Sequence, residues 1–270
     1  MKRRITALAL ACVTLALLLA GCGGGKTDWD YISGKGNMII GITYFKPMDY
    51  LDDDGTTVIG FEADFARAVC EKIGVTPKFQ VIDWDSKETE LSAKNIDCIW
   101  NGMTITDERK QNMDLTAAYM ANRQVMVVRS ADAAKYSDDA NIAGANAVAE
   151  KGSTGEDLIL TDEKDLFAGA NYTALDSQAK ALLEVKAGTA DIAAIDYTMA
   201  LASTGPGTDY ADLVIINDGR FDPQSYAVAF RKDSPNTLKK VNDAMNELAA
   251  DGTLKAIADK YNLGALILLK

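Results

Sequence analysis

Short apolar runs rich in β-branched residues alternate along the chain with segments in which apolar residues recur at helical spacing. The clearest helical stripe predicts a helix over residues 61–73 that ends before Gly74, and two more predict helices near residues 238–248 and 254–261. The apolar runs predict strands at residues 38–43, 78–82, 96–100, 124–128, 145–149, 192–196, 213–216 and 226–230. Because strands alternate with helices, we expect an α/β fold with largely parallel strand pairing.

The first 36 residues follow a different pattern. Three basic residues precede an uncharged, mostly apolar run at residues 5–20, which is shorter than the roughly 20 residues of a spanning helix and is typical of a secretory signal. The segment Leu19-Ala20-Gly21-Cys22 resembles the lipobox of bacterial lipoproteins, in which the Cys is acylated. We therefore expect a signal peptide at residues 1–21 and a lipidated Cys22 with a flexible tether at residues 22–36. The alternative is a plain secretory signal in which Cys22 is incidental.

Composition narrows the possible functions. The chain has 270 residues, of which 48% are hydrophobic, so it has room for two lobes with real cores. A net charge of −11 argues against a nucleic-acid partner. The chain has no His, which removes the commonest general base and metal ligand. Cys70 and Cys98 belong to no Cys-x-x-Cys pair, and both a disulfide and two free thiols stay open. We expect no metal and no cofactor.

The segment that follows the strand at residues 96–100 carries candidate ligand-binding groups. Loops at the carboxyl ends of strands are where open α/β sheets bind ligands. Thr104 offers a hydroxyl and an amide, Gly102 a carbonyl without a Cβ beside it, and Arg109 a planar guanidinium suited to a carboxylate. Considered alone, Arg109 is more often a surface ion-pair residue.

Four ordered motifs resemble those of the bacterial extracellular amino-acid-binding proteins that serve ATP-driven importers, the solute-binding protein family 3. They lie within residues 37–261. Their sequences are Gly60-Phe61-Glu62-Ala63-Asp64-Phe65, the segment Asn101 to Arg109 with Met-Thr-Ile-Thr before the Arg, Gly152-Ser153-Thr154-Gly155-Glu156, and the strand from Asp191 to Asp196.

The resemblance implies a site for the two charged groups of an amino acid. Arg109 and Thr104 would hold the ligand α-carboxylate, and Asp196 with the Gly102 carbonyl would hold the α-ammonium. Residues 152–154 precede an expected helix start, so their backbone amides, with Ser153 and Thr154, form a natural anion seat. Ser153 or Thr154 would serve equally as an ordinary helix cap, and Asp196 as a turn cap.

The resemblance also implies two aromatic side chains that sandwich the ligand side chain. Phe45 and Trp84 match these positions best, and Tyr44 is an alternative to Phe45. Further candidates without a decisive pattern are Trp100, for which a core position is favoured, and Asp83, Asp85 and Glu90.

These features together predict a periplasmic-binding-protein-like fold of two α/β lobes joined by a two-strand hinge. We expect lobe 1 at residues 37–119 plus 226–270 and lobe 2 at residues 120–225, with crossovers near 120–124 and 223–225. The protein would be a monomer, lipid-anchored on the extracellular or periplasmic side, that captures a free amino acid for a membrane permease and its separate ATPase. Two alternatives stay open: a cyclohexadienyl or arogenate dehydratase-like enzyme, with Glu90, Asp83 or Asp85 as general acid, and a tethered amino-acid sensor.

Overall fold

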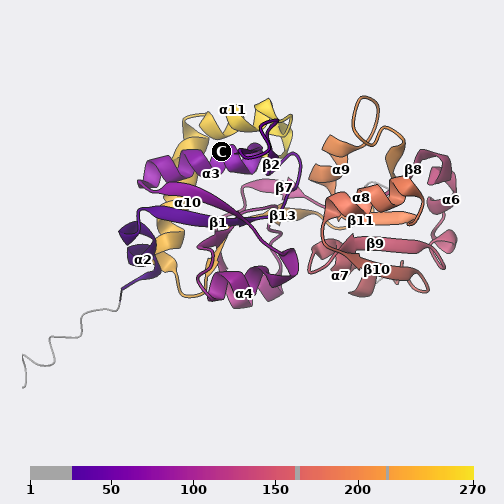
Figure 1. Cartoon of the computed structure of the whole chain (residues 1–270), viewed down its shortest axis with the longest axis horizontal. Coiled ribbons are helices and arrows are strands. Elements are labelled where there is room, and N and C mark those ends of the chain that lie inside the picture. Colours follow the sequence, from indigo (N-terminus) through magenta and orange to yellow (C-terminus); the bar gives the residue numbers. More distant parts are fainter. Residues whose placement is uncertain (1–25, 162–164, 217–218) are drawn as a thin grey trace, which may run out of the picture.

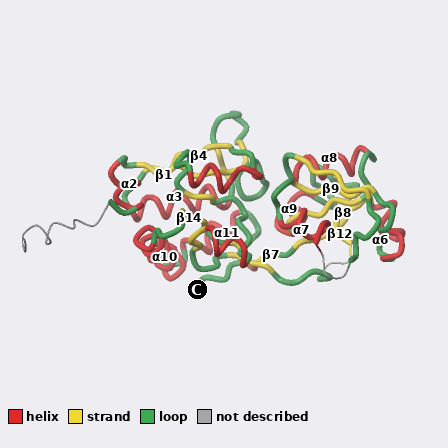
Figure 2. The backbone as a smooth tube through the Cα atoms, turned by 90° about the horizontal axis from the view of Figure 1, so that it is seen from below, coloured by secondary structure: helices red, strands yellow, loops and turns green. Residues whose placement is uncertain are grey.

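Two α/β lobes lie side by side and are joined by a pair of antiparallel strands, β7 (Met120–Asn122) and β13 (Gln224–Tyr226). The computed structural model describes residues 26–161, 165–216 and 219–270, and both views place β7 between the lobes (Figure 1, Figure 2). The expected signal peptide and Cys22 lie outside the described residues. Within those ranges, no helix is long and apolar enough to cross a membrane.

Lobe 1 is built on a five-stranded sheet in the order β4-β1-β5-β14-β6. Its strands are β1 (Asn37–Ile42), β4 (Thr76–Val81), β5 (Cys98–Ile99), β6 (Met113–Leu115) and β14 (Ala229–Arg231). A small hairpin, β2 (Tyr50–Leu51) with β3 (Val58–Ile59), precedes the first long helix. The helices are α2 (Asp28–Gly34), α3 (Phe61–Ile73), α4 (Lys87–Ser92), α5 (Asp107–Asn112), α10 (Pro235–Ala250) and α11 (Thr253–Lys260). Helices α3, α10 and α11 pack together, while α4 packs on β5 and β14.

Lobe 2 repeats this plan with a sheet in the order β10-β9-β11-β8-β12. Its strands are β8 (Gln124–Arg129), β9 (Asn146–Glu150), β10 (Asn171–Leu175), β11 (Ile192–Asp196) and β12 (Leu213–Ile216), and its helices are α6 (Ala133–Tyr136), α7 (Thr154–Thr161), α8 (Gln178–Ala187) and α9 (Tyr197–Ser203). Alternate residues of β8 enter two cores. Val125 and Val127 pack with α8 and α9, whereas Met126 and Val128 pack with Tyr136 of α6 and Ile159 of α7.

Strand direction differs from the expectation of largely parallel pairing. In each sheet two pairings are parallel and two are antiparallel. Strands β1, β5, β9 and β11 run toward the space between the lobes, but β8 and β14 each follow a joining strand and therefore start there. A strand that enters from the other lobe must run against its neighbours, and hydrophobic periodicity carries no information on direction.

The element boundaries agree with most of the apolar patterns. The helix α3 spans the predicted residues, and Gly74 caps it in the left-handed conformation with φ 75°. The single strand predicted at residues 226–230 is wrong, because β13 ends at Tyr226 and β14 begins at Ala229. The apolar run is continuous there because the chain stays buried as it passes from the joining strands into lobe 1.

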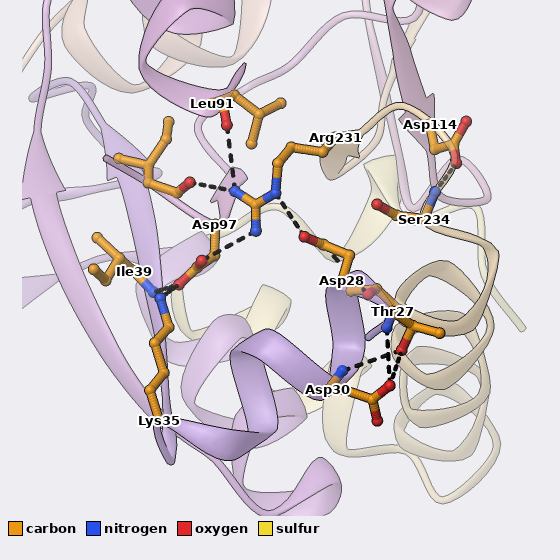
Figure 3. A network of polar contacts seen from close by, with 12 residues as sticks. Thr27, Asp28, Asp30, Lys35, Ile39, Leu91, Asp97, Asp114, Arg231 and Ser234 are labelled. Atoms are coloured by element: carbon orange, nitrogen blue, oxygen red, sulfur yellow. Dashed lines mark hydrogen bonds and ion pairs between the residues drawn. The ribbon is translucent and has the colours of Figure 1, made fainter. Parts of the chain in front are cut away.

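A buried ion-pair network ties the N-terminal helix α2 to the lobe 1 sheet (Figure 3). The Arg231 guanidinium donates to Asp28 at 2.6 Å, to the Ile96 carbonyl at 2.6 Å and to Asp97 at 3.2 Å. Asp97 is fully buried, accepts the Ile39 amide and forms an ion pair with the Lys35 ammonium. The network lies at the end of the sheet away from lobe 2, because Asp97 precedes β5.

Cys70 and Cys98 are free thiols, and both are buried in lobe 1. Burial raises the pKa of the Cys70 thiol to about 12 and also raises that of Cys98. Of the two possibilities left open by the sequence, the structure has the reduced pair.

Candidate ligand-binding site

A small cavity lies between the lobes, at the carboxyl ends of β1, β5, β9 and β11. All the ligand-binding residues predicted from the sequence line this cavity: Phe45, Trp84, Gly102, Thr104, Arg109, Ser153, Thr154 and Asp196. It is also lined by Thr43, Tyr44, Asn101, Glu150, Gln178 and Met199. The structure thus brings the predicted residues together, and what they bind stays a prediction.

Arg109 is held by the loop and helix that follow β5. Its amide donates to the Thr106 hydroxyl at 3.1 Å, which caps α5. Its guanidinium donates to the Thr104 carbonyl at 2.9 Å and, from lobe 1 to lobe 2, to the Gly152 carbonyl at 3.3 Å. Burial lowers the pKa of Arg109, but a guanidinium remains cationic at neutral pH. The cavity therefore contains a fixed positive charge on its lobe 1 side.

Gly102 needs to be glycine in this loop. Its φ of 57° is in the left-handed region, and an added Cβ would lie 2.4 Å from Cε1 of Phe45. Beside it, the Asn101 side chain accepts from the Thr43 amide and hydroxyl and donates to the Thr43 carbonyl. The cavity wall of lobe 1 is therefore ordered by contacts between the segments that follow β1 and β5.

Two buried carboxyl groups lie behind this wall. Glu62 accepts the Gly102 amide and the Tyr119 hydroxyl, while Asp49 accepts the Asn101 amide at 2.8 Å. Burial raises the pKa of Glu62 to about 7, and burial together with the Glu62 charge raises that of Asp49 well above its ordinary value. The sequence motif contained Glu62, but nothing in its pattern indicated this contact.

Asp196 supplies a negative group from lobe 2. It is the residue before α9, yet its side chain makes no capping hydrogen bond, so the turn-cap alternative is wrong. Its carboxylate instead accepts side-chain amides from Asn122, from Gln124 at 2.8 Å and from Gln178 at 2.5 Å. Burial raises the pKa of Asp196, whereas these amides lower it. The amides hold the carboxylate in place beside the cavity.

The expected anion seat is only partly available to a ligand. Ser153 caps α7 by accepting the Glu156 amide at 3.1 Å, and Thr154 accepts from Gln124 at 2.8 Å. The Gly152 amide donates to the Glu156 carboxylate at 2.6 Å, and the Ser153 amide donates to the Glu150 carbonyl at 3.2 Å. Two of the three expected backbone donors thus have partners within the protein: an acidic side chain in the first turn of α7 takes one amide, and a backbone carbonyl takes the other.

Further polar contacts, besides that of Arg109 with Gly152, join the lobes around the cavity. The Lys87 ammonium donates to the Gly152 carbonyl at 2.9 Å, Lys151 pairs with Asp85 at 2.9 Å, and the hydroxyl groups of Thr198 and Tyr226 are 2.9 Å apart. Burial lowers the pKa of Lys87 to about 8. The lobes are therefore in contact over the cavity, and the sequence pattern had not singled out Lys87 for this position.

The remaining candidates fall into two groups. Tyr44 and Phe45 both line the cavity. Trp100 is fully buried and packs edge-on against Phe65, with ring centroids 5.3 Å apart, as the core interpretation predicted. Asp83, Asp85 and Glu90 are outside the set of lining residues. Glu150 and Gln178 were missed, although Glu150 ends a strand just as Asp196 does.

Comparison with known proteins identifies this architecture. The sequence profile of the bacterial extracellular solute-binding proteins, family 3, matches residues 38–264. The chain belongs to this family. It is 28% identical to the arginine-binding extracellular protein ArtP of Bacillus subtilis over 267 residues, covering 98% of this chain and 99% of ArtP. It is 26% identical to the L-cystine-binding protein TcyJ of Escherichia coli K12, covering 85% of this chain and 84% of TcyJ.

A solved structure shows the same likeness in three dimensions. The histidine-bound substrate-binding protein of an ABC uptake transporter from Streptococcus pneumoniae matches with a TM-score of 0.80 at 30% identity. The match covers 88% of this chain and 96% of that chain. The two-lobed α/β fold predicted from the sequence is thereby confirmed as that of a family 3 solute-binding protein.

Proposed function

We propose that this protein captures one free amino acid between its lobes and delivers it to the permease of an ABC importer. Family membership supports the solute-binding role, and the similar proteins named above bind arginine, cystine and histidine. The observation that carries the proposal is that buried Arg109 and buried Asp196, which belong to different lobes, line one cavity. Arg109 would hold the ligand α-carboxylate and Asp196 its α-ammonium.

This arrangement would couple binding to closure. The two charged groups are on different lobes. Among the described residues, we place the crossings between the lobes near residues 120–124 and 223–225. A zwitterion can satisfy both charges only when the lobes are together. Thr104, Ser153, Thr154 and the Gly102 carbonyl would complete the polar contacts, and Phe45 and Trp84 would flank the side chain.

Titration calorimetry with a panel of free amino acids tests the proposal. Wild-type protein should bind at least one of them, and Arg109→Met should weaken that binding by at least about 100-fold, because a buried charge without its partner costs on the order of 3–5 kcal/mol. Arg67→Met, which removes a half-exposed arginine of α3, is the matched control and should bind normally. Binding by Arg109→Met within threefold of wild type would show that the carboxylate is held elsewhere.

The second part of the proposal concerns the membrane. Cys22 would be acylated after removal of residues 1–21, so that a monomer stays tethered to the outer side of the membrane beside its permease and ATPase. Cells that express the full chain should incorporate radiolabelled fatty acid into it, and Cys22→Ala should abolish the label. Label that persists in Cys22→Ala would contradict the anchor.

We also propose that the bound amino acid leaves the site unchanged. The acids considered for a dehydratase, Asp83, Asp85 and Glu90, do not line the cavity, although fold alone does not separate binding from catalysis. NMR spectra of amino acids and of arogenate-like precursors should be the same after prolonged incubation with the protein. Turnover that is lost in Arg109→Met would favour the enzyme.

A further inference from the structure

Glu150 places a carboxyl group in the cavity for which the site described above has no use. It is the last residue of β9 and is 3% exposed. Among the described residues, its Oε1 atom has no hydrogen-bond partner, although Gln178 lies close to the carboxyl group. A buried carboxyl oxygen without a donor is costly, so native proteins seldom leave one without a role.

The neighbours of Glu150 already have other partners. The Lys87 ammonium donates to the carbonyl oxygens of Trp84 and Gly152, and the Arg109 guanidinium donates to those of Thr104 and Gly152. Asp196 lies close enough to repel a charge on Glu150. Burial is the main cause that raises the pKa of Glu150 to about 8, and repulsion by Asp196 is the second. A hydrogen bond from Gln178 and the positive charges of Lys87 and Arg109 lower this pKa.

The rest of the cavity wall favours a cation as the missing partner. Three aromatic side chains of lobe 1, Tyr44, Phe45 and Trp84, line the cavity with Glu150. Aromatic faces attract guanidinium and ammonium groups, as carboxylates do. The net charge of −11 adds a long-range attraction for cationic ligands. A carboxylate and aromatic rings around one cavity suit a positively charged nitrogen better than an apolar or anionic side chain.

We propose that Glu150 selects an amino acid with a cationic nitrogen at the far end of its side chain, either a guanidinium or an ammonium group. The inference rests on the proposed amino-acid function and assigns the contact for the ligand side chain. Arg109 and Asp196 would hold the two groups common to all amino acids, and Glu150 would pair with the group that distinguishes one ligand from another.

Matched ligands and one substitution test this assignment. Arginine and citrulline have nearly the same shape but differ in charge, and lysine differs from norleucine in the same way. In wild-type protein the preferred cationic ligand should bind at least about 100-fold more tightly than its neutral counterpart. Glu150→Gln should weaken the cationic ligand by about 100-fold and leave the neutral one within threefold. Glu71→Gln, on the exposed surface of α3, should change neither affinity.

Proton release is a second readout that does not depend on relative affinities. Burial raises the pKa of Glu150 in the empty cavity, and a bound cation would lower it again. Calorimetry in buffers of different ionisation enthalpy should therefore detect net proton release on ligand binding near pH 7 in the wild-type protein, and less release in Glu150→Gln. Circular dichroism tests whether the variant is folded. Glu150→Met is a second variant, and it should show the same loss of preference for the cationic ligand over its neutral counterpart.

The outcomes separate this inference from the proposed function. If wild-type protein binds the neutral ligands as tightly as the cationic ones, the Glu150 assignment is wrong while amino-acid binding stands. An equal loss for both kinds of ligand in Glu150→Gln would place Glu150 on the α-ammonium beside Asp196 and would also overturn it. If no amino acid binds the wild-type protein, the proposed function fails and this inference fails with it.

Discussion

The Glu62 carboxylate and the Gly102 backbone amide are joined by a forked hydrogen bond, with distances of 3.0 and 2.9 Å from the amide nitrogen to the two carboxylate oxygens. Glu62 is fully buried in the first turn of α3, and Gly102 lines the cavity. A residue that does not line the cavity therefore sets the orientation of a peptide group that does.

We expect Glu62→Gln to weaken amino-acid binding by about tenfold and to lower the free energy of unfolding by about 1–3 kcal/mol. The new NH₂ group would face the Gly102 N–H or the Tyr119 O–H, and a buried donor would lose its acceptor. Calorimetry and urea unfolding measure the two effects, with Glu71→Gln as the exposed control. Unchanged affinity in a folded Glu62→Gln protein would show that Gly102 is positioned without Glu62.

Asp97→Ala should lower stability without changing affinity. It leaves the Arg231 guanidinium without one of its two carboxylate partners in a buried network, which costs on the order of 3–5 kcal/mol. The cavity lies at the opposite end of the sheet, so the calorimetric affinity should stay within threefold. Asp243→Ala, which breaks an exposed pair with Lys239, should change the urea midpoint very little. Equal midpoints for the two variants would contradict the role of the network.

Gly152→Ala should weaken ligand binding because its Cβ would lie 3.0 Å from Cα of Asp85 in the other lobe. Its φ of 70° adds a backbone penalty of about 1 kcal/mol. Gly144→Ala is the matched control, since its φ is 79° but nothing lies within 4 Å of the added Cβ. Ligand-dependent compaction, measured by solution scattering, should decrease in the first variant only. The same compaction in both variants would mean that Gly152 does not limit closure.

The ligand-free protein should lose stability as the pH rises from about 5 to 8. Burial raises the pKa of Glu150 from its ordinary value of 4.5 to about 8, so the folded state binds more protons than the unfolded state in this window. The free energy of unfolding should fall by at most about 1.4 kcal/mol per pH unit from this group. Glu62 also has a raised pKa in this pH window, but it is present in both wild type and Glu150→Gln. The difference between their urea-unfolding profiles therefore isolates the contribution of Glu150. Parallel profiles for the two proteins would contradict the raised pKa.

The four ordered motifs located the cavity residues, because each motif is a local feature of the sequence. The apolar run before residue 101 indicated a loop where ligands bind, since the carboxyl ends of such strands meet at one edge of a sheet. Arg109 and Asp196, however, received their roles only from the family resemblance. The predicted helices fared well for a similar reason, since the stripe from Phe61 to Ile73 and the glycine after it are both local features.

Other features depend on contacts that no local pattern encodes. The pairing of Glu62 with Gly102 spans 40 residues, and the Glu156 carboxylate reaches an amide that we had expected a ligand to use. Glu150 was missed because one acid after apolar residues is an ordinary strand end. Its role depends on burial beside Asp196, which only the folded chain provides.

The place of β14 within the lobe 1 sheet has a consequence for how the chain acquires its structure. Because β14 lies between β5 and β6, lobe 1 lacks an inner strand until residue 231 has been synthesised. All five strands of lobe 2 are present by residue 216. As domains tend to fold as units during synthesis, the second lobe in the sequence can complete its sheet first. The strands of lobe 1 that precede lobe 2 can complete their sheet only after β14 has been synthesised. A chain truncated before β14 would have a complete lobe 2, an incomplete lobe 1 and no cavity between them.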